Sequence, residues 1–233
     1  MLVSQIVRYR SHVVMDRISD VGVLDKSMAI LGAVEAGPQA LAGLVLLTGF
    51  PRASAHRLAA ALEYHGLLRR DDLGRFALGP RLVELGRLAA TGSPLNEAAR
   101  PVLRELVEAT GESAQLYVRD GDRRVCVESI QSPHGLRTIV GVGAIMPLDR
   151  GSAGRVLADL DAAVRKRGWA ASVGEREAGV ASVSAPVRDS DGRVRAAVSV
   201  SGPIERTTRH PGRLYADAVG AAARSIERAV GWP

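Results

Sequence analysis

Apolar residues recur every three to four positions over the first third of the chain, which is the spacing that gives a helix one buried face. This period predicts three short helices over residues 23–36, 40–47 and 51–64, each followed closely by a glycine. Two strand-like segments, 67–70 and 75–78, then flank a turn rich in Asp and Gly, and they predict a β-hairpin. Three short helices followed by a hairpin are the plan of a winged helix-turn-helix.

A different pattern follows the break at Thr91-Gly92-Ser93-Pro94. Period-2 alternation predicts a strand hairpin over 180–187 and 194–201, and further strands over 113–119 and 124–130. The other predicted elements are a helix over 81–90, a helix over 96–109 that Pro101 either kinks or starts late, a strand pair over 137–147, one or two helices over 152–167, and a helix over 214–230. Strands bracketed by helices indicate an α+β, sensor-like domain.

These elements divide the chain into four predicted segments. Residues 1–15 form an N-terminal extension, because a second methionine, Met15, precedes polar residues and is the start that we expect. A winged helix-turn-helix domain covers residues 16–79, a linker helix covers residues 80–94, and the α+β domain covers residues 95–233.

The predicted third helix has one apolar face and one polar face, an arrangement that suits DNA reading. Its apolar residues recur at i, i+3, i+4 and i+7: Ala55, Leu58, Ala59 and Leu62. The DNA-binding candidates are the polar residues of this helix and the basic residues of the hairpin: Arg52, Ser54, His56, Arg57, Arg69, Arg70 and Arg75. An arginine can donate two hydrogen bonds to guanine, which discriminates by ~1–3 kcal/mol, and a serine with first-turn N–H groups can hold a phosphate. The alternative is an ordinary solvated surface.

Net charge adds little to this prediction. The chain carries a charge of +6, and 29 of its 31 basic residues are arginine, a bias that a GC-rich genome produces whatever the function. Residues 16–90 hold nine basic and eight acidic residues, and residues 91–233 hold twenty and seventeen. Only local placement supports DNA binding, with five arginines against three acidic residues between Phe50 and Arg75. An aromatic fraction of 3% argues against a protein that stacks single-stranded bases.

Other function classes lack the residues that they need. Neither a Gly-x-Ser-x-Gly elbow nor a His-Glu-x-x-His pair occurs, and Gly141-Val142-Gly143 lacks the third glycine of a dinucleotide-binding loop. We therefore expect no enzyme, no metal and no cofactor. The single cysteine, Cys126, lies in an apolar strand, which favours a core residue in a reducing cytosol over a nucleophile. No run of 18 apolar residues occurs, so we expect a cytoplasmic protein without a membrane span.

Short motifs occur along nearly the whole chain, at residues 23–26, 49–58, 62–70, 74–79, 111–113, 151–154, 167–169, 174–177, 184–187 and 199–203. They resemble the motifs of the IclR family of bacterial transcriptional regulators. The resemblance implies a winged helix, a linker helix and a GAF-like effector-binding domain. It also implies homodimers or dimers of dimers that bind palindromic double-stranded operator DNA and respond to a small-molecule effector.

The hydroxyl groups of the predicted strand hairpin are candidates for an effector pocket. Period 2 places Ser199 and Ser201 on one strand face, and Ser182 and Ser184 on one face of the neighbouring strand. From the residues alone, these groups either face solvent or line a small polar pocket. The resemblance favours a pocket for a small organic acid or an amino acid, formed by Ser152, Ala153, Gly154, Ser172, Ser182, Ser199 and Ser201.

Two further features concern the branch of the family and a departure from it. Residues 179–186 and 206–213 resemble the actinobacterial branch that controls leucine and related amino-acid biosynthesis. The family usually has a further helix and a long loop between the positions of Leu160 and Val164, where this chain passes almost directly. The short connection is either a real deletion or a segment missing from the sequence, and we expect an altered pocket.

The sequence thus predicts a ligand-responsive, DNA-binding regulator of metabolic genes, with amino-acid biosynthesis as the expected target. The alternative is a DNA-independent small-molecule sensor or interaction protein that acts through partners. Salt-dependent binding to palindromic DNA would distinguish the two, because phosphate contacts release counterions.

Overall fold

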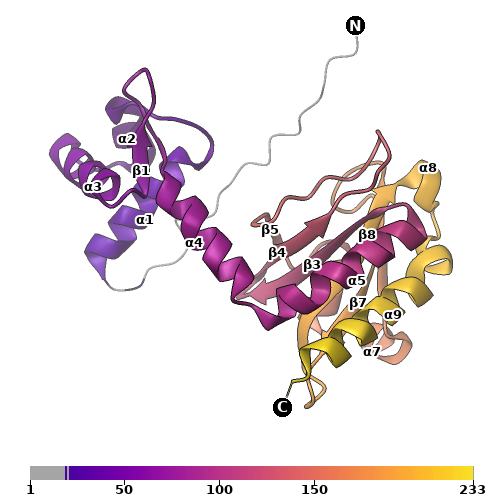
Figure 1. Cartoon of the computed structure of the whole chain (residues 1–233). Coiled ribbons are helices and arrows are strands. Elements are labelled where there is room, and N and C mark those ends of the chain that lie inside the picture. Colours follow the sequence, from indigo (N-terminus) through magenta and orange to yellow (C-terminus); the bar gives the residue numbers. More distant parts are fainter. Residues whose placement is uncertain (1–18, 20, 233) are drawn as a thin grey trace, which may run out of the picture. The chain divides into compact units, whose positions relative to one another are not determined.

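The computed structural model describes residues 19 and 21–232, which form two compact units that divide between Ala89 and Ala90 (Figure 1). Each unit has a hydrophobic core of its own. The predicted N-terminal extension, residues 1–15, lies outside the described residues.

The N-terminal unit packs three helices against a short antiparallel hairpin. Its elements are α1 (Gly22–Glu35), α2 (Leu41–Thr48), α3 (Arg52–Tyr64), β1 (Leu68–Arg70) and β2 (Phe76–Leu78). Ile30, Leu44 and Phe76 are fully buried where the helices meet the hairpin. Phe76 also exchanges two backbone hydrogen bonds of 2.8 Å with Gln39, which ties the segment before α2 to the hairpin. The predicted winged helix-turn-helix is confirmed.

A glycine allows the hairpin to return against the end of α3. A Cβ atom at Gly79 would lie 2.1 Å from the carbonyl oxygen of Gly66, so only glycine fits this approach. The helix α4 (Pro80–Thr91) begins at the next residue. Its side chains Val83, Leu85 and Leu88 are 74%, 41% and 48% exposed, so α4 presents apolar groups to solvent within its own unit.

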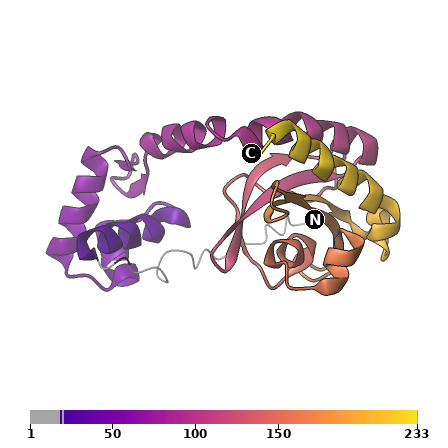
Figure 2. The same ribbon diagram turned by 90° about the horizontal axis from the view of Figure 1, so that it is seen from below.

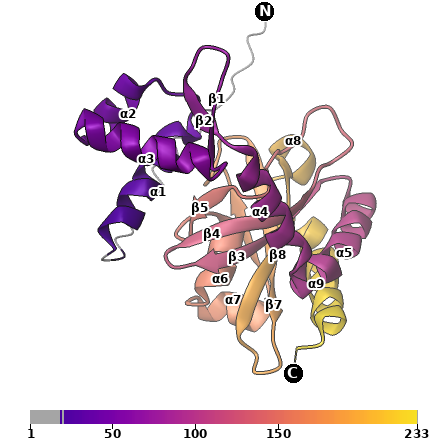
Figure 3. The same cartoon turned by 60° about the vertical axis from the view of Figure 1, so that its left-hand side comes forward.

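The C-terminal unit is built on a six-stranded antiparallel sheet with the order β5-β4-β3-β8-β7-β6. Its elements in chain order are α5 (Pro94–Thr110), β3 (Ser113–Asp120), β4 (Arg123–Ile130), β5 (Ile145–Pro147), α6 (Gly151–Ala158), α7 (Ala162–Arg167), β6 (Ala170–Val173), β7 (Val180–Arg188), β8 (Val194–Pro203), α8 (Ile204–Thr207) and α9 (Pro211–Val230). Helices α5 and α9 cover one face, and α6 and α7 lie on the other (Figures 2 and 3).

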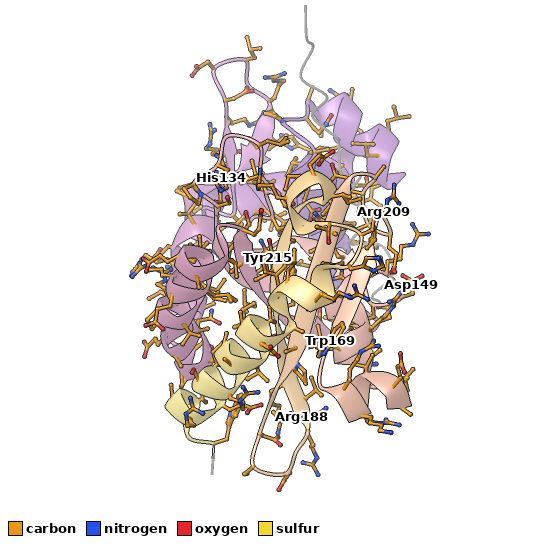
Figure 4. All side chains as sticks on the ribbon, turned by 90° about the vertical axis from the view of Figure 1, so that its right-hand side faces the viewer. His134, Asp149, Trp169, Arg188, Arg209 and Tyr215 are labelled. Atoms are coloured by element: carbon orange, nitrogen blue, oxygen red, sulfur yellow. The ribbon has the colours of Figure 1, made fainter. Side chains whose placement is uncertain are left out.

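The alternation of side chains along β7 and β8 separates the two faces of the sheet. Val183, Val187 and Val198 point toward α5 and α9 and join the larger core. Serines occupy the alternate positions, on the face that α6 covers. Trp169, labelled in Figure 4, packs on the start of α9, where a Cβ atom at Gly212 would lie 2.3 Å from its ring. Trp169 therefore has a packing role.

Two predictions about these elements need correction, and two short elements were missed. The segment 137–147 is not a strand pair, because residues 137–144 are irregular and only β5 is a strand. Pro101 does not mark a later helix start, since α5 begins at Pro94 behind a cap from the Ser93 hydroxyl. The short elements β6 and α8 were not predicted, because four residues are too few to show a period.

The connection between α6 and α7 is a tight turn with its own capping residues. Asp159 adopts a left-handed conformation with φ of 49°, and Leu160 is 84% exposed. The Asp161 carboxylate then accepts hydrogen bonds from the N–H groups of Ala163 at 2.8 Å and Val164 at 3.3 Å, which caps α7. The predicted helical region over 152–167 is therefore two separate helices.

Candidate nucleic-acid interface and effector pocket

The helix α3 buries the apolar face that its period predicts and leaves the polar face exposed. Ala55, Leu58, Ala59 and Leu62 all belong to the buried core of the unit. On the other side, Arg52, His56 and Arg57 are exposed, and Ser54 is half-buried.

The arginines of the α3 surface have guanidinium groups available for a partner. Within the described part of the chain, Arg52 and Arg57 form no hydrogen bond or ion pair through their side chains, and the same holds for Arg69 on β1. A guanidinium group held in water without a carboxylate can meet a phosphate or a base edge without breaking an existing bond.

The two other predicted arginines of the hairpin have partners inside the wing. Arg70 stacks over the Phe76 ring at 3.7 Å and donates to the carbonyl oxygen of Gly74 at 2.8 Å. Arg75 pairs with Asp71 at 2.8 Å. Desolvation raises the pKa of Asp71, but hydrogen bonds from Arg75 and Leu73 outweigh it and hold that pKa below its ordinary value. Arg70 and Arg75 therefore shape the turn.

In the C-terminal unit, the N-terminus of α6 and the strands β6, β7 and β8 enclose a small pocket. Its lining residues are Tyr117, Arg124, Gly151, Ser152, Ala153, Ser172, Arg176, Val180, Ser182, Ser199 and Ser201. These include the predicted effector-binding residues except Gly154. A Cβ atom at Gly154 would lie 2.2 Å from the carbonyl oxygen of Leu148, so Gly154 packs directly against the backbone of Leu148 and is not a lining residue.

A chain of hydroxyl groups forms one wall of this pocket. The Ser152 Oγ lies 2.7 Å from the Oγ atoms of both Ser182 and Ser184. Ser182 continues to Ser172 at 3.0 Å, and Ser184 donates to Ser199 at 2.9 Å. Of the two alternatives for these hydroxyls, the structure has the buried one. Ser184 is a member of the chain that the candidate residues did not include, although its period placed it on the same face.

Two guanidinium groups line the pocket, and sequence reasoning named neither. Arg124 is 3% exposed and donates to the carbonyl oxygen of Pro147 at 2.8 Å and to that of Arg150. Arg176 has a side chain that is 18% exposed. Neither aspartate nor glutamate is among the lining residues of the pocket, so the charged groups that line it are cations. The pocket has a free volume of about 20 Å³, enough for one water molecule.

A glutamate outside the pocket holds the first turn of α6 in place. Glu175 accepts a hydrogen bond of 3.0 Å from the N–H of Gly151 and forms an ion pair with Arg155.

Cys126 is fully buried in the core beside the pocket, as predicted. Burial raises the pKa of its thiol to about 12, so the sulfur stays protonated at neutral pH.

Comparison with known proteins decides the family. The IclR helix-turn-helix domain matches residues 23–72, and the bacterial transcriptional regulator IclR C-terminal domain matches residues 88–163 and 158–228. The chain belongs to the IclR family. It is a DNA-binding transcriptional regulator, and its family is one of regulators and not of enzymes.

Relatives of this IclR-family protein align over most of its length. The HTH-type transcriptional regulator KipR of Bacillus subtilis is 30% identical over 241 residues, which cover 89% of this chain and 96% of KipR. The glycerol operon regulatory protein of Streptomyces coelicolor is 28% identical and covers 89% and 94% of the two chains. A transcriptional regulator from Rhodococcus sp. RHA1 has the same fold, with a TM-score of 0.76, 25% identity and coverage of 90% and 98%.

A solved IclR homolog from Microbacterium hydrocarbonoxydans was crystallised as a complex with 4-hydroxybenzoate. It is 22% identical with a TM-score of 0.74, and the match covers 89% of this chain and 98% of that one. This similarity is one of fold.

The IclR C-terminal domain matches this chain in two segments that overlap at residues 158–163, where the α6–α7 turn lies. The expected departure from the family falls at the same place.

No helix in residues 19 and 21–232 combines the length and the apolar character that crossing a membrane requires.

Proposed function

We propose that this protein binds palindromic operator DNA as a homodimer or a dimer of dimers and that a small carboxylate in the α6 pocket controls the binding. The observation that carries the first half is the set of exposed arginines without partners in the described chain, Arg52 and Arg57 on α3 and Arg69 on β1. The buried apolar face of α3 fixes the direction in which Arg52 and Arg57 point.

The arginines of α3 and of the wing have different expected roles. A helix in the major groove brings its N-terminal side chains to the base edges, so Arg52 and Arg57 are the base-reading candidates. His56 lies between them on the same exposed surface, and Ser54 with the first-turn N–H groups is placed to hold a phosphate. Arg69 is the wing residue best placed for a backbone contact, because Arg70 and Arg75 are bonded within the hairpin.

The test uses the full chain and fluorescence anisotropy on an operator found by footprinting upstream of its own gene. Arg52→Ala and Arg57→Ala should each weaken binding about tenfold to a hundredfold, because each removes a bidentate contact of ~1–3 kcal/mol. The matched control is Arg104→Ala, which removes an exposed arginine on α5. Absence of salt-dependent operator binding by the wild type would favour the DNA-independent sensor, and binding unchanged in both α3 variants would contradict the role of these arginines.

The pocket supports a carboxylate ligand by its charge and its hydroxyl groups. Arg124 and Arg176 supply positive charge, and the serine chain supplies donors that can rotate toward a ligand. The double substitution Ser199→Ala with Ser201→Ala should abolish the effect of the effector on DNA binding and leave DNA binding itself intact. An unchanged response would contradict the pocket assignment.

Assembly into dimers is supported by apolar side chains that the N-terminal unit leaves exposed. Val23 and Leu24 on α1 are 66% and 51% exposed, and Val83 on α4 is 74% exposed. A second copy would remove this apolar surface from water. Light scattering on wild type and on Val83→Asp tests the proposal, since the charged variant should shift the mass toward the monomer.

The target genes that we propose are those of amino-acid biosynthesis, leucine biosynthesis in particular. The support is the resemblance of residues 179–186 and 206–213 to the leucine-controlling branch of the family. Relatives named for the glycerol operon and the acetate operon support metabolic targets more broadly. A regulator that binds operator DNA would act in the cytoplasm, which is the location that we propose. Footprinting upstream of leucine biosynthetic genes tests this proposal, and protection confined to other metabolic operons would contradict it.

A further inference from the structure

A row of polar side chains crosses one face of the sheet from β6 to β4. On β6, β7 and β8 the row contains the pocket-lining serines Ser172, Ser182, Ser199 and Ser201, together with Ser184. On β3 the next member is Gln115, which is the register partner of Ser199. On β4 it is Ser129, the register partner of Gln115. Cross-strand partners point to the same face of a sheet, so the row is continuous.

Gln115 has a buried amide donor without a partner in the described chain. Its residue is 0% exposed, and its Oε1 accepts a hydrogen bond of 3.0 Å from the hydroxyl of Ser201. The Nε2 of the same amide has no hydrogen-bond partner among the described residues. Ser201 lines the pocket and bonds to the Gln115 amide, so the Nε2 donor of that amide lies next to a lining residue.

Two neighbouring hydroxyls are in the same condition. The Ser129 Oγ and the Thr138 Oγ1 are buried and have no partner in the part of the chain that the structure describes. Thr138 lies against the same end of β3, since its carbonyl oxygen accepts a hydrogen bond of 2.7 Å from Ser113. Buried polar groups without partners are costly and rare. Three such groups near Gln115 therefore indicate a binding position for a polar ligand.

The connection over residues 131–140 forms no backbone hydrogen bonds with the described strands, so a displacement of it would leave the sheet paired. Residues 131–140 belong to the irregular connection that precedes β5, and His134 lies in this connection (Figure 4). Side chains hold it: Ser113 donates to the Thr138 carbonyl oxygen, and Arg206 donates to that of Leu136 at 2.9 Å. A shift of this connection would enlarge a pocket whose present free volume of about 20 Å³ admits one water molecule.

We propose that the effector pocket continues past Ser201 to Gln115 and that the effector is a small carboxylate with a second hydrogen-bond acceptor at its far end. This inference rests on the proposed carboxylate pocket. The carboxylate group binds to Arg124 and Arg176, and a carbonyl oxygen of the same effector accepts from Gln115 Nε2. Ser129 and Thr138 supply the hydroxyls around that oxygen.

Two pairs of probes of equal charge and length test the second acceptor by calorimetry: pentanoate with 4-oxopentanoate, and hexanoate with 5-oxohexanoate. The wild type should bind at least one oxo acid about fivefold to tenfold more tightly than its parent acid, the gain expected from one hydrogen bond. Gln115→Met keeps the side-chain length and removes the amide, so this preference should disappear while the affinity for the parent acid stays within about threefold.

The control is Gln39→Met, the same chemical change at a half-buried glutamine of the N-terminal unit, and it should keep the preference. Gln115→Leu serves as a second variant if Gln115→Met does not fold. Equal binding of both members of each pair by the wild type, or a preference that survives in the Gln115 variant, overturns this inference and leaves the carboxylate pocket standing. Failure of all four acids to bind the wild type overturns both.

Discussion

The α3 surface and the α6 pocket both use arginines, but they hold them in opposite ways. Arg52 and Arg57 are exposed and have no side-chain bond to another described residue. Arg124 is buried and donates to backbone carbonyl oxygens. DNA brings its own phosphates and base edges, and water solvates an exposed guanidinium until DNA arrives. A closed pocket has no such solvent, so its polar groups must bond to one another until a ligand replaces those bonds.

The hydroxyl chain follows from this difference. Ser152 satisfies two neighbours at once, and a ligand oxygen that displaces one of them exchanges one hydrogen bond for another. Only groups that no neighbour can reach, such as Gln115 Nε2, remain unsatisfied. The position of an unsatisfied group is therefore informative about a ligand in the pocket, whereas on the α3 surface every polar group is solvated.

The largest expected effect comes from a substitution that disrupts the hydrophobic core of the N-terminal unit and leaves the C-terminal unit intact. Phe76→Ala empties a fully buried site between the helices and the wing, and it should lower the stability of the N-terminal unit by about 3–5 kcal/mol. Operator binding should fall with it. Carboxylate binding should persist, because the pocket belongs to the other unit. Calorimetric unfolding and ligand titration of the same variant measure both effects.

A smaller effect distinguishes exposed arginines from bonded ones. Arg57→Ala should weaken operator binding about tenfold to a hundredfold and leave the melting temperature unchanged. Arg70→Ala should lower the melting temperature, because it removes the contacts of Arg70 with Phe76 and Gly74 in the wing. It should weaken operator binding less than Arg57→Ala does. Equal losses of DNA affinity in the two variants would mean that Arg70 leaves its stacked position to contact DNA.

The same contrast explains how much the sequence could predict. The face of α3 depends on thirteen consecutive residues, so a helical period suffices to find Arg52 and Arg57. The pocket depends on the register of β3 with β8, which brings Gln115 to Ser201 across 86 positions of sequence. Period 2 could place serines on a common face but could not say whether that face is buried. Arg124 and Arg176 were missed because no local pattern, including the motif 174–177 that contains Arg176, shows that the two side chains line one pocket.

Within the pocket, the expected effect on stability is smaller again. Ser184→Ala removes the hydroxyl that joins Ser152 to Ser199, so it should cost about 1–3 kcal/mol of stability by leaving buried hydroxyls with fewer partners. Ser225→Ala is the control, because its hydroxyl accepts from Arg228 at an exposed site. Urea denaturation monitored by circular dichroism measures both. A cost no greater than that of the control would mean that the hydroxyl chain does not hold the pocket closed.

The smallest expected effect concerns two hairpin turns, one in each unit, that share the pattern Asp-x-x-Gly-Arg. Asp71 N–H donates to the carbonyl oxygen of Arg75 at 2.9 Å, and Asp189 N–H donates to that of Arg193 at 3.0 Å. Desolvation raises the pKa of each carboxyl, but hydrogen bonds from the backbone and from an arginine outweigh it and bring both pKa values below 3.8. The arginine is Arg75 in one turn and Arg195 in the other.

Because the folded pKa lies below the unfolded one, each carboxylate stabilises its turn above about pH 4 and loses that contribution as the pH falls through the folded value. Carboxyl carbon shifts followed by NMR from pH 6 to pH 2 should show both groups titrating below 3.8. In Arg75→Gln the Asp71 midpoint should move up, and the Asp189 midpoint should stay, because the two turns lie in separate units. A shift of both midpoints would mean that the two units communicate through their hairpins.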